Sequence, residues 1–476
     1  MSATRTITID PVTRIEGHGK ITLQLDEKGK LADARFHVTQ FRGFEKFVEG
    51  RPLTEMPSVM ARICGICPVS HSMASAKACD ALLAVEIPVT AVKLRKLMHL
   101  AQLVQSHALS FFHLTSPDLL LGMDADPAIR NVVGLAQKHP EMLKDGIALR
   151  RLGQDIIALL GGKRIHPAWV VAGGVAEPLD AERRDKIAQT LPRAMEIARR
   201  TIDWYKTVVA KFGAEIESFA NFPSMHMGTV GPGGLLEQYH GGLRFVDAAG
   251  KIVTDGVPAA DYQTVIGEAV EKWSYMKFPY YLPAGYPAGF YRVGPLARLN
   301  VCDRCGTPLA DRELDEFRKH AGRPAASSFH FHWARLIEII NGLEVMQQLV
   351  DSPDIVDTFV RARARPNRFE GVGIVEAPRG TLIHHYKIDR NGQMTWANLI
   401  VATGHNNLAI SRGVKQVAER FVDGTKLREG MLNRCEALVR CFDPCLSCAT
   451  HALGQMALIV ELRDAQGQVL DEMRRG

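Results

Sequence analysis

Two cysteine motifs at opposite ends of the chain constrain the fold more than any other feature of the sequence. Cys64-Gly-Ile-Cys67 is followed by His71, and Cys445-Leu-Ser-Cys448 is followed by His451. A spacing of two residues lets both thiolates of a motif face one metal ion, and thiolates are soft ligands that suit zinc, nickel, copper or iron. If all four sulfurs meet, the fold must bring the first and last parts of the chain together.

The C-x-x-C spacing alone is also typical of a structural zinc site with four cysteine ligands. Structural zinc usually joins the parts of a short segment, whereas Cys67 and Cys445 lie almost a whole chain apart. The fold would then exist before the metal, and the site would lie in its middle, which suits a catalytic centre. An iron-sulfur cluster is the other alternative, but neither motif has the close run of three or four cysteines found in ferredoxin-like sites.

The composition is that of a globular protein with one large core. Of the 476 residues, 46% are hydrophobic and 23% charged, and no linker or low-complexity tract divides the chain. The net charge of +6 comes from scattered basic residues, so we expect no nucleic-acid partner. We also expect a cytoplasmic protein without a membrane segment, because no stretch is apolar enough and the start lacks a signal core. Nine cysteines in such a chain indicate metal or redox chemistry rather than disulfides.

Hydrophobic periodicity predicts three long helices. Apolar residues at helical spacing run from 90 to 114. A second helix would begin at a cap on Asp180 and run to about residue 212, with an interruption near Pro192. A third would begin at Ser327 or Ser328 and continue to about residue 349. Several long helices imply a bundle.

Alternating side chains predict a small antiparallel sheet formed by residues 5–9, 19–25 and 31–40. Irregular segments at 280–310 and 371–407 would wrap the bundle. The expected fold class is therefore α+β, mainly helical, with a long-helix bundle core and small peripheral antiparallel sheets. Because neither a P-loop nor a complete G-x-G-x-x-G motif occurs, we do not expect this chain to bind a dinucleotide itself.

The two cysteine motifs resemble the N-terminal and C-terminal signatures of nickel-iron hydrogenase large subunits. The resemblance extends through Thr13–His18, Arg42–Glu45 and Ala377–Gly380, in the order of the family, and so covers nearly the whole chain. It implies a single large-subunit domain over residues 1–451, in which residues 1–60 form an N-terminal sheet region. The active site would be buried near the interface with a small subunit, and residues 452–476 would be a propeptide removed during maturation.

The resemblance also implies the metal ligands. Cys64 and Cys445 would bind nickel terminally, while Cys67 and Cys448 would bridge nickel and an iron that carries carbon monoxide and cyanide. Four thiolates concentrate negative charge on the nickel, and the strong-field diatomic ligands keep the iron low-spin. Such a pair can split hydrogen heterolytically, with a nearby base taking the proton.

Residues around the metals follow from the same resemblance. Cyanide ligands in a dry pocket need hydrogen-bond donors, and Arg379, which follows Pro378, and Thr403 resemble those donors. An isolated arginine is usually a surface charge, but the fixed backbone of Pro378 favours the site role. Asp118 and Asp443 would hold the Arg379 guanidinium, although an N-cap is a competing role for Asp118.

Histidine and carboxylate residues complete the predicted site. His71 would donate to a bridging thiolate, or be a satisfied core histidine. Glu45 and His451, with the Leu399 carbonyl, resemble the ligands of a third metal, usually magnesium; a surface carboxylate is the alternative for Glu45.

The proton released near Cys445 needs a titratable neighbour, and Glu16 resembles the first proton acceptor of the family. Gly17 beside it would let the backbone pack against the site. The alternative is that Glu16 only pairs with Arg14.

Electrons must leave through other polypeptides, because the five remaining cysteines form no cluster relay. We leave Cys302 and Cys305 unassigned, between a zinc turn, a redox pair and two inert thiols, and treat Cys79, Cys435 and Cys441 as structural. The resemblance implies a small subunit with iron-sulfur clusters, a maturation endopeptidase and nickel-insertion factors.

Within the family, the opening segment looks most like the bidirectional, NAD-reducing subgroup, whose diaphorase subunits carry flavin, clusters and NAD. The deazaflavin- or heterodisulfide-linked cytoplasmic group is the alternative. A complex I-type quinone-module subunit, which would lack the thiolates, and a zinc scaffold protein with a four-cysteine site are the rivals from other classes.

Overall fold

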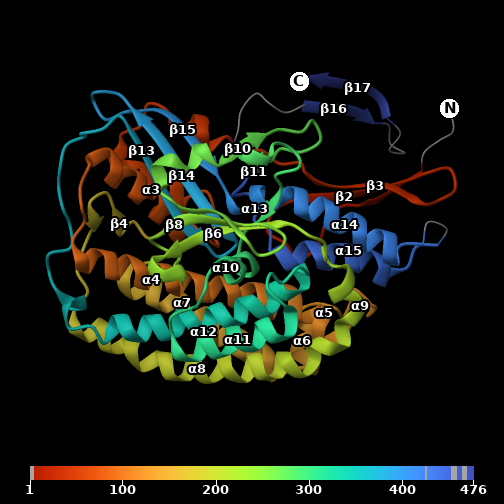
Figure 1. Cartoon of the computed structure of the whole chain (residues 1–476), viewed down its shortest axis with the longest axis horizontal. Helices are drawn as coiled ribbons and strands as arrows, with labels where there is room; N and C mark the ends of the chain where they lie inside the picture. The colour runs from red at the N-terminus through yellow and green to blue at the C-terminus, as the bar shows by residue number, and fades with distance from the viewer. Residues whose placement is uncertain (1–4, 424–425, 452–457, 464–468, 476) are drawn as a thin grey trace.

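Long helices packed side by side form one half of the molecule, and small sheets with shorter helices form the other (Figure 1). The computed structural model describes residues 5–423, 426–451, 458–463 and 469–475. The long helices contact one another in the order α7, α4, α12 and α8, with α11 against α12. They are α4 (Val89–Ala108), α7 (Pro140–Gly161), α8 (Ala181–Val208), α11 (Pro308–Ala321) and α12 (Phe331–Val350).

The three predicted helices are present with local differences. The first is α4, which continues through a π-helical segment (Leu109–Thr115) into α5 (Ser116–Leu121). In the second, Asp180 accepts the Arg183 N–H at 2.7 Å as the N-cap of α8, but α8 continues through Pro192 without interruption. The third begins with the cap of Ser327 on the Phe329 N–H (3.3 Å) and runs through α12.

Five of the six sheets in the described residues are built from strands that neighbour one another in the chain. The N-terminal sheet has the order β1-β2-β3 and is antiparallel, as predicted. A second antiparallel sheet, β13-β14-β15, packs on α3. The strands are β1 (Arg5–Ile9), β2 (Gly19–Leu25), β3 (Leu31–Val38), β13 (Glu370–Ala377), β14 (Gly380–Ile388), β15 (Met394–Ile400), and a C-terminal antiparallel pair, β16 (Leu458–Arg463) and β17 (Val469–Arg475).

The middle of the chain contributes a mixed sheet with the order β12-β6-β8-β9, in which β12 and β6 are parallel. Segment 280–310, expected to wrap the bundle, instead contains α10 (Pro295–Val301), whose residues are all buried. The strands of this sheet are β6 (Met225–Gly231), β7 (Leu235–Leu236), which pairs with β6, β8 (Gly242–Val246), β9 (Ile252–Val257) and β12 (Tyr291–Arg292). Two separate antiparallel pairs are β4 (Val170–Val171) with β5 (Gly174–Val175), and β10 (Ile266–Ala269) with β11 (Phe278–Tyr281).

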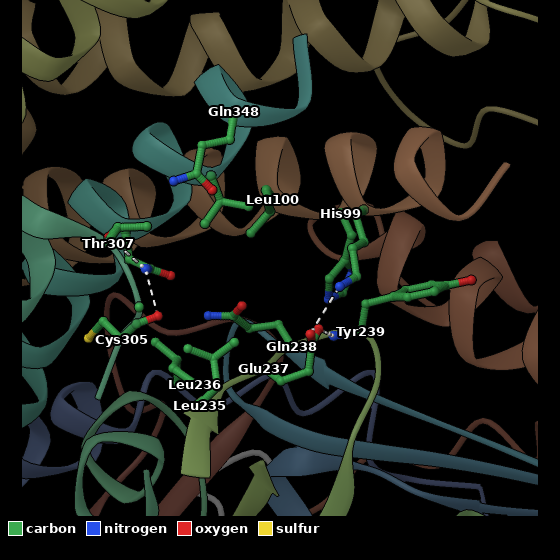
Figure 2. Close-up of a pocket in the computed structure, with 14 residues that line it drawn as sticks. His99, Leu100, Leu235, Leu236, Glu237, Gln238, Tyr239, Cys305, Thr307 and Gln348 are labelled. Atoms are coloured by element: carbon green, nitrogen blue, oxygen red, sulfur yellow. Dashed lines mark hydrogen bonds and ion pairs between the residues drawn. The ribbon is translucent and has the colours of Figure 1, made fainter. Parts of the chain in front are cut away.

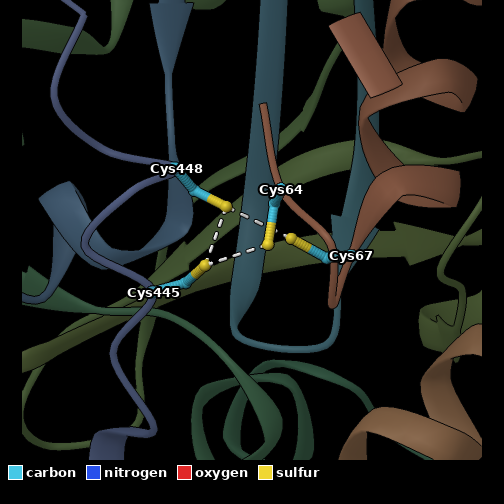
Figure 3. Close-up of side chains that lie close together, drawn as sticks. All are labelled: Cys64, Cys67, Cys445 and Cys448. Carbon is cyan, nitrogen blue, oxygen red and sulfur yellow. Dashed lines mark hydrogen bonds between the residues drawn. The ribbon is translucent and has the colours of Figure 1, made fainter. Parts of the chain in front are cut away.

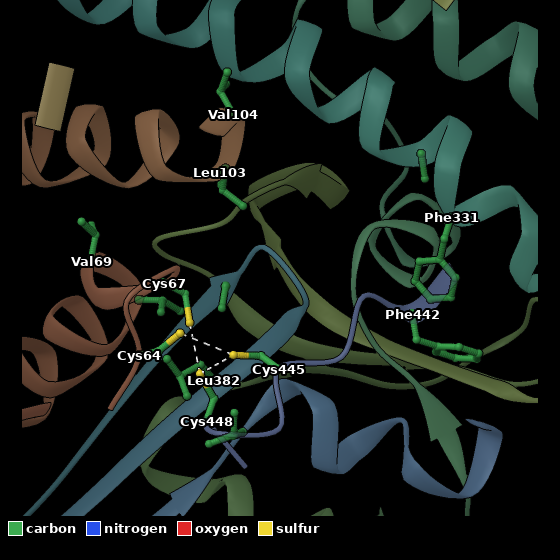
Figure 4. Close-up of a cluster of buried hydrophobic side chains, with 14 of the residues drawn as sticks. Cys64, Cys67, Val69, Leu103, Val104, Phe331, Leu382, Phe442, Cys445 and Cys448 are labelled. Carbon is green, nitrogen blue, oxygen red and sulfur yellow. Dashed lines mark hydrogen bonds between the residues drawn. The ribbon is translucent and has the colours of Figure 1, made fainter. Parts of the chain in front are cut away.

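Shorter helices connect these layers to the cysteine motifs. They are α1 (Phe44–Phe47), α2 (Met56–Ala61), α3 (Pro68–Leu83), α6 (Val132–Lys138), α9 (Gly213–Ser218), α13 (Ala402–His405), α14 (Asn407–Phe421) and α15 (Glu429–Phe442). One hydrophobic core cluster extends from the N-terminal sheet through the long helices and includes all four motif cysteines, with Val69, Leu103 and Leu382 near them (Figure 4). None of the helices in the described ranges is both long and apolar enough to cross a membrane.

Candidate metal centre

The four motif cysteines meet in the interior of the protein (Figure 3). Their ligand atoms all lie within 4.8 Å of one another, and each residue is buried. The Sγ atoms of Cys64 and Cys445 are 3.5 Å apart, those of Cys67 and Cys448 are 3.2 Å apart, and those of Cys445 and Cys448 are 2.8 Å apart. Within the described part of the chain, no other group of three or more His, Cys, Asp or Glu residues could share one metal ion.

Helix ends bring the two motifs to the same place. Cys67 is the N-cap residue of α3, and Pro68 occupies the first position of that helix, where its missing N–H costs nothing. The second motif follows α15, which ends at Asp443 in a left-handed conformation (φ 50°). Both motifs are therefore on turns at helix ends, where two side chains of a C-x-x-C can point to one side.

The sulfur cluster needs a cation. Burial raises the pKa of the Cys445 and Cys448 thiols well above the usual value, whereas hydrogen bonds from Cys445, Cys448 and Cys67 hold the pKa of Cys64 well below it. All four sulfurs can serve as metal ligands only when they are deprotonated, and four thiolates this close would repel one another in a medium of low dielectric constant. A soft cation bound between the sulfurs removes that cost, so this donor set is suited to a thiophilic metal.

A small cavity adjoins the cluster, and the predicted cofactor-binding residues surround it. Its lining includes Cys67, Cys445 and Cys448 on one side. The rest of the lining consists of His71, Ala377, Pro378, Arg379, Leu382, Val401, Ala402 and Thr403. The cavity therefore offers apolar walls with a few polar groups next to the sulfurs.

Arg379 is held at this cavity by Asp443. Its Nε donates to the Asp443 carbonyl oxygen (2.6 Å), Nη2 donates to the Asp443 carboxylate (3.2 Å), and Nη1 donates to Ser106 Oγ (3.3 Å). Burial disfavours the guanidinium, but the negative charges of Asp443 and the cysteines outweigh it and raise the pKa of Arg379 well above its usual value. Arg379 is thus a buried cation beside the sulfur cluster.

The predicted contact between Asp118 and Arg379 is wrong. Asp118 pairs with Arg14 (2.6 Å), Arg440 (3.1 Å) and Arg130 (3.4 Å). Although burial opposes it, Arg440 and Arg14 lower the pKa of Asp118. The competing N-cap role is also wrong, because Asp118 lies inside α5, whose N-cap is Thr115. Asp118 lies among these arginines because α5 packs against α6 and follows the π-helical segment, which contacts α15 and whose Leu114 carbonyl oxygen accepts from Arg14.

Thr403 contacts the second cysteine motif directly. Its Oγ1 accepts the Cys445 N–H at 2.9 Å, and the residue is 2% exposed at the start of α13. An oxygen that accepts from the backbone still has its own hydrogen to donate. Thr403 therefore links the Cys445 backbone to the cavity wall.

His71 belongs to a buried chain of polar groups that the sequence did not predict. Its Nδ1 lies 3.1 Å from His384 Nε2, and His384 Nδ1 lies 2.6 Å from the Tyr386 hydroxyl. Burial lowers the pKa of His71 to about 4, so its ring is neutral near pH 7. Side chains alternate along β14, so Leu382, His384 and Tyr386 lie on one face of the strand. This alternation in the sequence is the signal that predicts a contact between His384 and Tyr386.

Glu16 lies beside the second cysteine motif. Its carboxylate accepts the Ser447 N–H at 3.1 Å, and its carbonyl oxygen accepts the Leu446 N–H at 3.2 Å. A Cβ on Gly17, which has a φ of 86°, would lie 2.7 Å from Leu446 Cβ, so this position requires glycine. The alternative pairing of Glu16 with Arg14 is wrong, because Arg14 pairs with Asp118.

The predicted third-metal residues gather around a lysine that the sequence did not reveal as part of the site. Glu45 Oε1 accepts the Leu399 N–H (2.8 Å) and lies 2.9 Å from Lys277 Nζ, which also pairs with Glu268 (3.1 Å). His451 Nδ1 accepts the Phe44 N–H (3.4 Å). Its buried Nε2 has no hydrogen-bond partner among the described residues, so this nitrogen can act as a ligand.

The remaining cysteines are buried and protonated. Burial raises the pKa of Cys302 and of Cys435 to about 12, and raises those of Cys305, Cys79 and Cys441 as well. Neutral thiols are poor nucleophiles. Cys302 and Cys305 also belong to no group of three or more potential metal ligands among the described residues, so of the open alternatives two inert thiols agree best with this environment.

A larger cavity lies away from the cysteines (Figure 2). It has a volume of about 150 Å³ and is lined by residues of α4, α12 and the segments around β7 and Thr307. His99 and Tyr239 form one side, and Cys305 lies on the other. None of the predicted site residues lines it.

Comparisons with known proteins agree with this geometry. A family model described as HoxL-like matches residues 6–41, and the model described as nickel-dependent hydrogenase matches residues 42–146 and 237–451, more than half of the chain. The chain is 44% identical over 491 residues to "NAD-reducing hydrogenase HoxS subunit beta" of Cupriavidus necator, covering 99% of this chain and 100% of that protein. It is also 44% identical over 466 residues to one chain of the F420-non-reducing hydrogenase vhc of Methanococcus voltae, covering 97% and 98%.

Solved structures give the same result. An NAD+-reducing [NiFe]-hydrogenase in the H2-reduced state superposes with a TM-score of 0.92 at 44% identity, over 94% of this chain and 100% of that chain. The Ni-Fe-Se hydrogenase from D. vulgaris Hildenborough gives a TM-score of 0.78 at 25% identity, over 94% and 100%. With its four converging cysteines and these matches over nearly its full length, the chain belongs to the nickel-dependent hydrogenase family, as a nickel-iron hydrogenase large subunit.

Proposed function

We propose that this chain is the catalytic subunit of a hydrogenase that reversibly cleaves H2 into protons and electrons and transfers the electrons, through partner subunits, to NAD+. The observation that carries the proposal is the meeting of four buried cysteines beside a cavity that Arg379 and Thr403 line. This arrangement combines soft ligands, a reaction space and hydrogen-bond donors in a dry interior.

We assign Cys64 and Cys445 as terminal nickel ligands and Cys67 and Cys448 as ligands that bridge nickel and iron. The short distances across each pair, 3.5 Å and 3.2 Å, support a compact centre to which each motif contributes one thiolate of each kind. When bound, the nickel-iron centre with carbon monoxide and cyanide on its iron polarises H2 so that it splits heterolytically.

The cavity walls serve the iron ligands in this proposal. Arg379, positioned after Pro378, and Thr403 would donate hydrogen bonds to cyanide, because both line the space next to the bridging cysteines. Asp443 keeps the Arg379 guanidinium oriented. His71 would donate to a bridging thiolate from the same wall.

Glu16 is the proposed first proton acceptor. The proton of H2 goes to the Cys445 thiolate, and the neighbouring carboxylate then receives it. The support is local: Glu16 bonds to the backbone of Leu446 and Ser447, the two residues after Cys445. Its side chain is partly exposed, which gives the proton a way out of the interior.

We also propose a magnesium ion held by Glu45, His451 and the Leu399 carbonyl. The support is the buried ring nitrogen of His451, which has no hydrogen-bond partner among the described residues and lines a small cavity together with Leu399. Glu45 would exchange its pairing with Lys277 (2.9 Å) for the ion. Bound there, magnesium would fix the segment that follows Cys448.

Electrons would leave through a small subunit that carries iron-sulfur clusters. The surface hollow lined by Arg150, Arg151 and Arg164 supports docking close to the cysteine cluster, because His166, two residues after Arg164, has its Nε2 3.0 Å from the Cys64 carbonyl oxygen. Diaphorase subunits with flavin and clusters would then reduce NAD+ in the cytoplasm.

A deazaflavin- or heterodisulfide-linked hydrogenase of the cytoplasm is the second candidate. The 44% identity to the F420-non-reducing relative favours only its heterodisulfide-linked form, because F420 is a deazaflavin and that relative is named as not reducing it. The superposition on the NAD+-reducing enzyme, with its TM-score of 0.92, supports our choice. Purifying the native complex under anaerobic conditions, identifying its subunits and testing H2-dependent NAD+ reduction would separate the two; a complex without flavin-bearing diaphorase chains and without NAD+ reduction would favour the second.

Maturation completes the proposal. Residues 1–451 would form the mature domain, and an endopeptidase would remove residues 452–476 after nickel-insertion factors had loaded the metal. The antiparallel pair β16-β17 supports a separate C-terminal unit, although residues 452–457 and 464–468 lie outside the described residues.

One experiment tests the central assignment. The purified native complex is analysed for nickel, iron and zinc, and its infrared spectrum is searched for bound carbon monoxide and cyanide. Nickel together with the diatomic bands supports the proposal, whereas zinc alone would support a zinc scaffold and refute hydrogen chemistry.

A further inference from the structure

Arg298, on the buried helix α10, uses every hydrogen that its guanidinium can donate. Nε and Nη2 donate to the Glu338 carboxylate, both at 2.6 Å. Nη1 donates to the Glu376 carboxylate and to the Ala377 carbonyl oxygen, both at 3.0 Å. The second hydrogen of Nη2 points to the Pro378 carbonyl oxygen at 3.2 Å. Five donors thus meet five acceptors, which only an arginine can provide.

Two of these acceptors belong to the turn that carries Arg379. This turn joins β13 to β14, with Ala377 opposite Gly380 in the ladder. It also lies directly on the start of α10, since a Cβ on Gly294 (φ 98°) would be 2.7 Å from the Arg379 carbonyl oxygen. Arg298 therefore holds the carbonyl groups of the two residues that precede Arg379, and the backbone there has no room to shift toward α10.

Arg298 is itself anchored from several elements. Glu338 comes from α12 and also lies 2.8 Å from His107 Nε2 on α4. Glu376 accepts the Thr229 N–H (3.0 Å) and the Thr381 hydroxyl (2.7 Å). Because the two carboxylates are fixed independently, the guanidinium has one orientation.

Stability alone does not explain this network. Arg298, Glu338 and Glu376 are at most 2% exposed, so each group lost its hydration on folding. A buried ion pair is often no more stabilising than apolar residues of the same volume. What the network adds is a fixed geometry for the turn that precedes Arg379.

We propose that Arg298 is a positioning residue for Arg379: by holding the Ala377 and Pro378 carbonyl groups, it sets the direction in which the Arg379 guanidinium enters the cavity beside the cysteines. The inference rests on the proposed role of Arg379 as a donor to the iron ligands. It assigns to α10 and α12, which contribute no ligand, a part in the hydrogen reaction.

Arg298→Lys in the native complex tests the inference, because lysine keeps the charge but cannot bond to two carboxylates and two carbonyl groups at once. We expect full nickel content, cyanide bands shifted in the same direction as in Arg379→Lys, and H2 oxidation per nickel lowered about tenfold, the effect of one misplaced charge-assisted hydrogen bond. The double variant should have the bands of Arg379→Lys alone, since Arg298 acts through Arg379.

Arg95→Lys is the matched control. Arg95 is equally buried and pairs with Asp80 at 2.6 Å, but its other bonds go to Val171, Gly174 and Tyr239 rather than to the turn. This variant should lose stability while its nickel-loaded molecules keep wild-type bands and turnover.

The outcomes separate the inference from its premise. Wild-type bands and turnover per nickel in Arg298→Lys would overturn the inference, whatever the stability of the variant. Wild-type bands in Arg379→Lys would refute the proposed role of Arg379, and the inference with it. If Arg298→Lys does not accumulate, Glu338→Gln loosens the same guanidinium while keeping its shape, and unshifted bands in that variant would overturn the inference.

Discussion

Replacing Glu16 by glutamine separates proton transfer from structure at the site. The carboxylate accepts one backbone N–H, from Ser447 at 3.1 Å, and the amide oxygen of glutamine can accept the same bond. The change from a charged to a neutral acceptor costs about 1 kcal/mol, small for a chain of this size. Glutamine cannot ionise, so a proton acceptor is lost while the fold is kept.

The expected result is a loss of turnover with an intact metal site. General acid-base groups contribute about 10² to 10⁴ in rate, so steady H2 oxidation and the exchange between hydrogen gas and water protons should both fall by at least about 10². Nickel content and the diatomic infrared bands should be unchanged, and the thermal midpoint should move by no more than about 2 °C.

Glu436→Gln is the matched control. Like Glu16, Glu436 accepts one backbone N–H, but its donor is Thr13 (2.5 Å) in the opening segment and not a residue of the cysteine turn. This variant should lose a similar amount of stability and keep the exchange activity. A stable, nickel-replete Glu16→Gln enzyme with undiminished exchange would remove Glu16 from the mechanism.

Four further predictions follow from the site. Cys67→Ser or Cys448→Ser should lose nickel and activity together, because a hard hydroxyl does not replace a soft bridging thiolate; metal analysis with full nickel would mean that the ligands are wrong. Arg379→Lys keeps the charge but loses the fork that Asp443 holds, so H2 oxidation per nickel should fall about 10-fold to 100-fold, and near-normal turnover would make Arg379 structural. Gly17→Ala puts a Cβ 2.7 Å from Leu446 Cβ, so thermal unfolding should show a loss of about 1 to 3 kcal/mol, and an unchanged midpoint would contradict the close approach. The intact mass of the active chain should correspond to an end at His451, and an active chain that ends at Gly476 would refute processing.

The sequence predicted the parts of the fold that repeat and the parts of the site that lie in motifs. The alternating strands at 5–9 and 19–25 match β1 and β2, and the Asp180 cap begins α8 where predicted. The low helix propensity of proline predicts an interruption at Pro192, but α8 continues through it, because packing of α8 against α12 tolerates one missing hydrogen bond in the helix.

Contacts between segments that are distant in the chain could not be predicted from the sequence. Asp118 was assigned to Arg379 by analogy, but the partner of a buried carboxylate depends on which of several arginines the tertiary packing brings nearest, and here those are Arg14 and Arg440. The role of Arg298 is not predictable from the sequence for a related reason. Its segment is rich in proline and glycine, which predicts irregular structure, whereas residues 295–301 form the buried helix α10 next to the Arg379 turn.

The separation of the two cysteine motifs in the sequence also determines when, during synthesis, the chain can bind its metal. Cys64 and Cys445 are 381 residues apart in the chain, and closing a loop of that length costs about 3 kcal/mol more entropy than closing the loop of a short zinc finger. During translation, the first motif leaves the ribosome long before the second exists, so a nascent or truncated chain offers only two of the four thiolates. A metal ion can therefore find all four ligands only after the second motif has been synthesised, and an unfinished chain does not hold the metal centre.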